Sequence, residues 1–363
     1  MLKKVLLLLF AFLILFTHQT FAQTKPLPVQ EEVKGSIVSV DAKDFDEAGK
    51  LQKIIFDVKL DDGNTIKADF QPSDSLKLDL NEGDQVVMTK SHMAGATSYQ
   101  IIDNYRLPSL LWFLLVFAII AILIVGRKGI GSLLGLLVSL GIILYGIVPL
   151  ILKGFDPLLV TIGFSFLIIL VTTYLAHGIS RQTTIALVST FISLLIALGL
   201  SVFSIELLNI NGFGSEDVYN LSFAMGGTIN AKGLLLSGII IATLGALNDV
   251  TITQTATIFE LKKLNKDMKF LDMIKSGLNI GREHGASMVN TIVLAYAGSS
   301  LFVFIFFLVN PQKQPLWAMM NNEFMVEEFV KTLGGTIGIL MSVPIVTLLA
   351  AWLVDRRFRK KSS

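Results

Sequence analysis

Polar side chains interrupt the second half of one long apolar run, and their types could bind an ion or relay a proton. Residues 233–260 begin as a transmembrane segment and turn polar without a proline that would break the helix. A carboxylate in such a segment is costly unless it faces protein or a wet cavity, so it is a functional-site hypothesis by default. The ion- or proton-coupling candidates are Asn248, Asp249, Thr253 and Gln254.

Helical spacing divides this polar half into two neighbouring stripes. One stripe holds Asn248, Thr251 and Thr255, and the other begins with Asp249 and Thr253. Because two polar stripes leave little surface for lipid, we expect this half of the helix to pack inside a bundle. Asp249 is the residue we favour for proton or cation binding. The alternative is a structural role, as a helix cap or as a hydrogen-bond clamp to the next span.

A second polar stretch, residues 281–300, is the expected partner of this helix. It follows a basic, amphipathic segment at 259–286. Its small and polar residues allow close approach between helices. His284 could exchange a proton near neutral pH or cap a helix start at the surface. The candidates on this facing helix are Arg282, Glu283, His284, Asn290 and Thr291.

The composition excludes several kinds of chemistry. The chain has no cysteine, and its four histidines are dispersed, with none at metal-ligand spacing. It contains no nucleophile-elbow, Walker A or HExxH motif. An intramembrane hydrolase would need a nucleophile and a base together, and only isolated candidates exist. We therefore expect no catalytic residues, no metal, no cofactor and no enzymatic activity.

The first hundred residues predict an exported β domain. Residues 1–22 have two early lysines and an apolar run, which is typical of a signal peptide, with an uncleaved anchor as the alternative. Residues 23–106 contain five short runs that favour strands, separated by turns at 61–64 and 81–84. We expect a small all-β domain there, a barrel of OB-like type.

The rest of the chain predicts a polytopic helical bundle at residues 107–355, followed by a basic tail at 356–363. With 53% hydrophobic and 16% charged residues, the composition is that of a membrane protein. Two ridges of small residues, at Gly131–Ser139 and Gly334–Ser342, indicate close helix packing. We expect seven spans, at about 109–126, 130–152, 156–176, 183–204, 233–256, 287–309 and 332–354.

The distribution of charge predicts the orientation. Lysine and arginine concentrate in the segment 259–286 and in the tail 356–363. Such residues favour the cytoplasmic side of a membrane. We therefore expect the N-terminal domain outside the cytoplasm and the C-terminus inside.

Two segments carry a family resemblance. LNDVTITQ (247–254) and GREHGASMVNTIVLAYAGSS (281–300) closely resemble the paired signatures of the YibE/F family of bacterial multi-pass membrane proteins. The resemblance implies a location in the bacterial cell membrane and covers nearly the whole chain. It implies little about activity, because the biochemical role of the family is poorly defined.

The same segments show a weaker similarity to the transmembrane unit of resistance-nodulation-division transporters and of SecD/SecF. That unit has an apolar helix ending in an acidic pair, a cytosolic amphipathic helix, and a helix that opens with Thr or Asn. The similarity implies that Asn248 and Asp249 correspond to a proton-relaying acidic pair. The chain departs from the pattern because one acid is Asn and because no large exported domain is inserted in the unit.

These observations lead to two functional hypotheses. The first is a transporter or permease-like protein, ion- or proton-coupled, with its polar site between the fifth and sixth spans. The second is a membrane receptor or assembly factor that binds a partner through the exported β domain. The expected partners are the lipid bilayer, an unknown small solute or ion, and a paralogous membrane subunit or further copies of the chain. We expect no nucleic acid among the binding partners.

Overall fold

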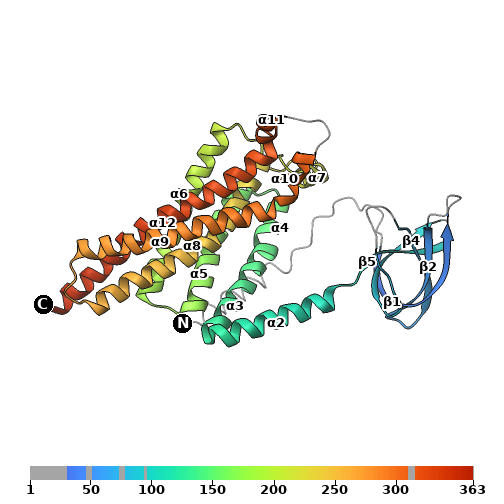
Figure 1. Cartoon of the computed structure of the whole chain (residues 1–363), viewed down its shortest axis with the longest axis horizontal. Helices are drawn as coiled ribbons and strands as arrows, with labels where there is room; N and C mark the ends of the chain where they lie inside the picture. The colour runs from blue at the N-terminus through green and yellow to red at the C-terminus, as the bar shows by residue number, and fades with distance from the viewer. Residues whose placement is uncertain (1–30, 46–50, 73–77, 94–95, 310–314, 363) are drawn as a thin grey trace. The chain divides into compact units, whose positions relative to one another are not determined.

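The computed structural model describes residues 31–45, 51–72, 78–93, 96–309 and 315–362. They fall into two compact units, one within Ala22–Ile124 and one beginning at Val125 (Figure 1). The expected signal peptide, residues 1–22, lies outside the described residues.

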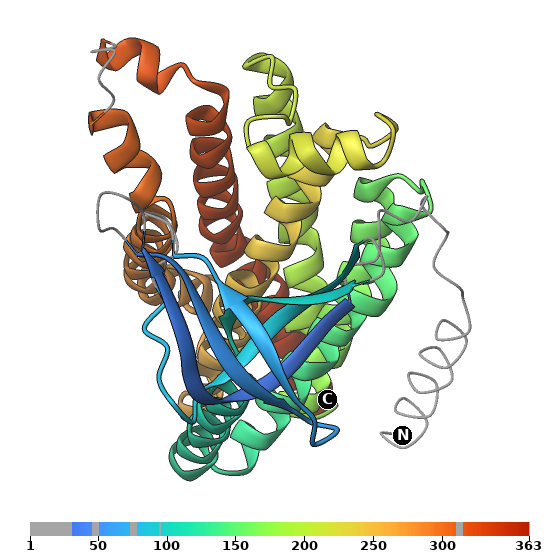
Figure 2. The ribbon, with the colours of Figure 1, turned by 90° about the vertical axis from the view of Figure 1, so that its right-hand side faces the viewer.

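The first unit contains a closed five-stranded barrel, which confirms the small β-barrel predicted from the sequence (Figures 1 and 2). The strands are β1 (Glu31–Phe45), β2 (Leu51–Leu60), β3 (Thr65–Phe70), β4 (Gln85–Met93) and β5 (Ala96–Asn104). Around the barrel their order is β1-β2-β3-β5-β4, and β4 pairs with β1 to close it. Only β3 and β5 pair in parallel among the described strands.

Alternation and turn chemistry explain why these residues form a barrel. Alternate side chains point inward and make one apolar core: Ile37, Phe56, Val58, Ala68, Phe70, Val86, Met88 and Ile101. Between β2 and β3 the backbone N–H of Leu60 donates to Asn64 at 2.9 Å. Gly63 supplies the positive φ, 88°, that this turn needs.

The described residues contain six helices that are long and apolar enough to cross a membrane. They are α2 (Leu107–Val125); the continuous segment of α3 (Arg127–Ile142), the π-helical turn η1 (Ile143–Ile147) and α4 (Val148–Leu152); α5 (Pro157–His177); α6 (Arg181–Leu207); α8 (Ala231–Leu264); and α12 (Glu323–Ser362). The shorter helices α7 (Glu216–Ala224) and α11 (Leu316–Met320) lie in the connections between them.

The expected span at 287–309 is not one continuous helix. Its residues are shared between α9 (Phe270–Ser299) and α10 (Leu301–Val309), which meet at Ser300. The predicted amphipathic segment and the start of the predicted span have instead fused into the single helix α9. The reason is local, because Gly298, Ser299 and Ser300 are weak helix formers that end α9 before the apolar run is complete.

The bundle is built around α8, which contacts α5, α6, α9 and α12. Small residues allow α12 to approach its neighbours closely. A Cβ on Gly338 would lie 2.5 Å from the Cβ of Ala197 on α6, and one on Gly334 would lie 2.5 Å from Oγ of Ser201. These contacts confirm that the ridge predicted at Gly334–Ser342 is a packing surface. In Figure 1, α8, α9 and α12 run together along the second unit.

Candidate functional site

The polar half of α8 presents its two stripes to different surroundings. Thr251 and Thr255 are fully buried, whereas Asp249 and Thr253 are exposed. The expectation that both stripes pack inside the bundle is therefore wrong for the stripe of Asp249. Adjacent stripes are about 100° apart around the helix, and the bundle covers the stripe of Thr251 and Thr255 but not that of Asp249.

Asn248 and Gln254 tie α8 to other helices. The hydroxyl of Thr173 on α5 donates to Oδ1 of Asn248 at 2.9 Å. Gln254 is 2% exposed, and its Nε2 donates to the backbone oxygen of Gly277 on α9 at 2.7 Å and to Oγ1 of Thr347 on α12 at 2.8 Å. Both amides thus serve as interhelical clamps, a role that the sequence suggested only as the alternative for Asp249.

Asp249 lies within electrostatic range of two imidazoles. They are His177, the last residue of α5, and His284 on α9. His284 is half-buried, and its Nε2 is inaccessible yet makes no hydrogen bond with any described residue. A carboxylate and two imidazoles, from α8, α5 and α9, thus lie close enough to interact electrostatically.

The other candidates on α9 lie outside this set. Arg282, Glu283 and Asn290 are exposed. Thr291 is also exposed, and its hydroxyl donates within α9 to the backbone oxygen of Ser287 at 3.0 Å. The structure thus brings His284 toward Asp249 and leaves the remaining four on the helix surface.

A small polar cavity of about 180 Å³ adjoins this site. Its wall includes Lys128 at the start of α3, His177, and Ile252, which is nearly one turn beyond Asp249 on α8. The remaining lining residues are Ser180, Gln182, Thr183 and Ala186. The sequence did not connect His177 to Asp249, because nothing in the spacing relates residues so far apart.

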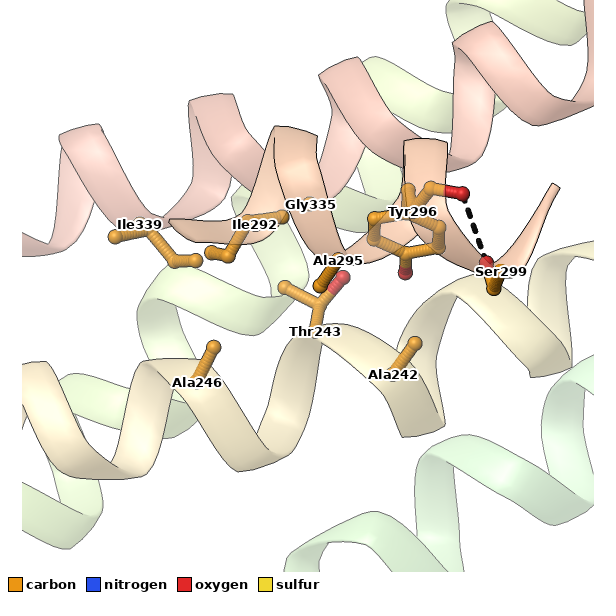
Figure 3. A pocket seen from close by; sticks show the side chains of 9 residues that line it. All are labelled: Ala242, Thr243, Ala246, Ile292, Ala295, Tyr296, Ser299, Gly335 and Ile339. Carbon is orange, nitrogen blue, oxygen red and sulfur yellow. Dashed lines mark hydrogen bonds between the residues drawn. The ribbon is translucent and has the colours of Figure 1, made fainter. Parts of the chain in front are cut away.

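A second cavity, of about 320 Å³, lies between α8, α9 and α12 (Figure 3). It is mainly apolar, and Thr243 and Tyr296 bring hydroxyl groups to its wall. Thr243 is 2% exposed, and its hydroxyl has no hydrogen-bond partner among the described residues. The sequence did not indicate this cavity, because alanine, glycine and isoleucine in a span are equally typical of close packing.

No metal site emerges from the described part of the chain. No group of three histidine, aspartate or glutamate side chains there is close enough to hold an ion.

A family model described as YibE/F-like protein matches residues 113–356 of this chain. The matched residues are more than half of the chain. The chain belongs to the YibE/F-like family. The match includes every candidate site residue on α8 and α9, and it leaves the barrel outside. Together with the apolar helices, membership identifies a membrane protein whose helices contact the lipid bilayer. A search of curated proteins found no match. The similarity to the resistance-nodulation-division and SecD/SecF unit stays a prediction.

Proposed function

We propose that the protein is a transporter or permease-like membrane protein that couples transport to proton binding at Asp249. The observation that carries this proposal is the grouping of Asp249 with His177 and His284 on three different helices. An ionised carboxylate attracts a protonated imidazole, and a protonated carboxyl does not. Proton binding therefore changes the attraction between α8, α5 and α9, which is the differential interaction that a conformational change requires.

The polar cavity beside His177 supports a route for the proton from the inner side. It holds the amide of Gln182, the hydroxyl groups of Ser180 and Thr183, and the ammonium group of Lys128. Water in a polar cavity of this size can bridge such groups. In the proposed mechanism, His177 passes the proton between this cavity and Asp249, and His284 stabilises the ionised carboxylate.

The exposure of Asp249 and Thr253 supports a partner in the membrane. A carboxylate on a spanning helix is stable only against water or protein. We propose that a paralogous subunit or a further copy of the chain covers this face. We also propose that the chain lies in the bacterial cell membrane, with the barrel outside the cytoplasm and the C-terminus inside, and that it catalyses no covalent reaction.

Proton flux into liposomes tests the proposal. Purified protein is reconstituted, a pH gradient is applied, and a trapped dye reports the internal pH. We expect flux in the wild type and its loss in Asp249→Asn, because the amide cannot take up a proton at neutral pH. Glu260→Gln, which removes an exposed carboxylate paired with Lys263 on the same helix, is the matched control and should keep its flux.

Two results would count against the coupling site. Flux that survives in Asp249→Asn would remove the assignment. Wild-type flux equal to that of empty liposomes, with sodium and potassium also varied, would favour the second candidate function.

That second candidate is a receptor or assembly factor that acts through the barrel. On the barrel surface, β1 exposes three apolar side chains, Val38, Val40 and Phe45, which are 51%, 39% and 59% exposed. All three lie within eight residues of one strand, and exposed apolar patches mark interaction sites. If this function holds, residues 23–106 should capture a specific protein from a membrane extract, and Phe45→Ser should weaken the capture while Glu82→Gln should not.

A further inference from the structure

We propose that the cavity between α8, α9 and α12 binds a small uncharged amphiphile, a molecule with an apolar body and one hydroxyl or carbonyl group. If the protein is a transporter, we expect its transported substrate to be a molecule of this class, and to that extent the inference rests on the proposed function. Binding itself does not depend on transport and is tested separately.

The wall of the cavity excludes a charged ligand. Its nine lining residues carry no charge: Ala242, Thr243, Ala246, Ile292, Ala295, Tyr296, Ser299, Gly335 and Ile339. Transferring an ion into such surroundings would remove its hydration without providing an opposite charge. An apolar molecule has no comparable hydration to lose when it enters the cavity. A volume of about 320 Å³ lies within the range of small-molecule sites, about 300–1,000 Å³.

Thr243 supplies the polar contact. A buried threonine in a helix usually donates to the backbone oxygen one turn earlier, as Thr255 does to Thr251 at 2.6 Å. Thr243 makes no such bond with the described residues, although it is 2% exposed. Buried polar groups nearly always have a partner. The hydroxyl of Thr243 is therefore suited to a hydrogen bond with a ligand.

Gly335 on α12 keeps this position open. A Cβ there would lie 3.0 Å from the hydroxyl oxygen of Thr243, so a larger residue would crowd this hydroxyl. At the other end, the hydroxyl of Ser299 is occupied, because it donates to the backbone oxygen of Tyr296 at 2.8 Å (Figure 3). The polar contact of the ligand is therefore expected at Thr243.

Tyr296 lines both this cavity and a neighbouring one. Its side chain also lines a cavity of about 140 Å³ bounded by α9, α10 and α12, where Phe304 and Glu328 contribute to the wall. Tyr296 is therefore the residue that a ligand would pass if it moved from the first cavity to the second.

Photolabelling with a diazirine-bearing octanol tests the inference on the full-length protein in nanodiscs, without any gradient. We expect saturable labelling of the cavity residues on α8, α9 and α12, read by mass spectrometry, and its displacement by unlabelled 1-octanol. Ala295→Phe fills the cavity and should abolish the labelling. Ala286→Phe makes the same change at an exposed position of the same helix, outside the cavity, and should leave it intact.

Thr243→Val preserves the shape of the side chain and removes only the hydroxyl. We expect 1-octanol to displace the label about 3- to 10-fold less effectively in this variant, as the loss of one hydrogen bond implies. Displacement by octane, which has no hydroxyl, should be unchanged. If Thr243→Val weakened displacement by 1-octanol and by octane equally, Thr243 would have no hydrogen-bonding role in binding.

Two outcomes would overturn the inference. One is unsaturable labelling spread over exposed apolar positions such as Leu294 and Phe302, which would mean partition into the bilayer alone. The other is labelling of the same cavity by a phospholipid with a diazirine in its acyl chain, not displaced by octanol, which would make the cavity a lipid site. Asp249→Asn should label as the wild type does, so failure of coupling and failure of binding are distinguishable.

Discussion

Asp249 and Gln254 lie little more than one turn apart on α8, and their surroundings differ completely. Gln254 is enclosed by α9 and α12 and donates two hydrogen bonds. Asp249 lies on the uncovered side and interacts electrostatically with His177 and His284. The same helix thus separates a structural amide from a group that can change its charge.

Removal of the Gln254 clamp should loosen the contact of α8 with α9 and α12. We expect Gln254→Leu to lower the free energy of unfolding by about 1–2 kcal/mol, because interhelical hydrogen bonds in membranes each contribute modestly. Unfolding in detergent, followed by tryptophan fluorescence, measures this change. Thr253→Val, on the exposed stripe, should change it by less than about 0.5 kcal/mol. An equal loss of unfolding free energy in the two variants would contradict the structural role of the Gln254 hydrogen bonds.

The sequence predicted the polar residues of α8 but not their division of roles. Helical spacing places Asn248 and Asp249 on different stripes, and it cannot say which stripe the other helices cover. That depends on long-range packing, such as the bond between Thr173 and Asn248. For the same reason the sequence indicated His284 as a candidate but did not relate it to His177.

At the scale of helices, the packing of α6 on α12 depends on glycine. Gly338→Ala should destabilise the protein by about 1–3 kcal/mol, because the added Cβ would lie 2.5 Å from that of Ala197 and force the helices apart. Gly199→Ala on α6 is the matched control, since a Cβ there meets no atom within 4 Å. Thermal unfolding in detergent measures both. A lower midpoint in the control than in Gly338→Ala would contradict the packing argument.

In the barrel, an ion pair joins the two strands that close it. Lys90 on β4 lies 2.7 Å from Glu31 on β1, and its hydrogen bond lowers the pKa of the Glu31 carboxyl. A lowered pKa in the folded state stabilises the barrel above the unfolded pKa of about 4.3, and this stability is lost as the pH falls through the folded value. The effect should be small, because the pair is exposed to solvent.

Urea unfolding of residues 23–106 between about pH 6 and pH 3 checks this expectation. The midpoint should fall as the pH is lowered, and it should fall less steeply in Glu31→Gln. Glu82→Gln, in the turn before β4, serves as the comparison. The idea fails if both variants follow the wild-type pH dependence.

Elements with a strong local pattern could be predicted, and those set by weak local preferences could not. The five strands were predicted because turns such as Asp61–Asn64 separate runs of alternating residues. The polar half of α8 was predicted as a continuous helix because no proline interrupts it. The division of 287–309 at Ser300 was missed, since apolar length suggested a span and outweighed the small polar residues that end α9.

For the whole molecule, the absence of cysteine makes orientation directly measurable. Glu82→Cys, in an exposed barrel turn, should react with a membrane-impermeant maleimide on intact cells. Lys266→Cys, in the exposed connection between α8 and α9, should react only after the cells are permeabilised. Retained activity in the flux assay is the control for folding. Labelling of Lys266→Cys on intact cells would invert the proposed orientation.

The strand order of the barrel also sets the timing of its formation during synthesis. β5 is the last strand made, and it is inserted between β3 and β4. A nascent chain that ends before Asn104 therefore carries two unpaired strand edges, which are prone to join with other chains. Once Asn104 has emerged the ring can close, before the helices of the second unit have been made. Chains truncated within β5 should therefore aggregate, whereas chains that extend just beyond it should remain dispersed.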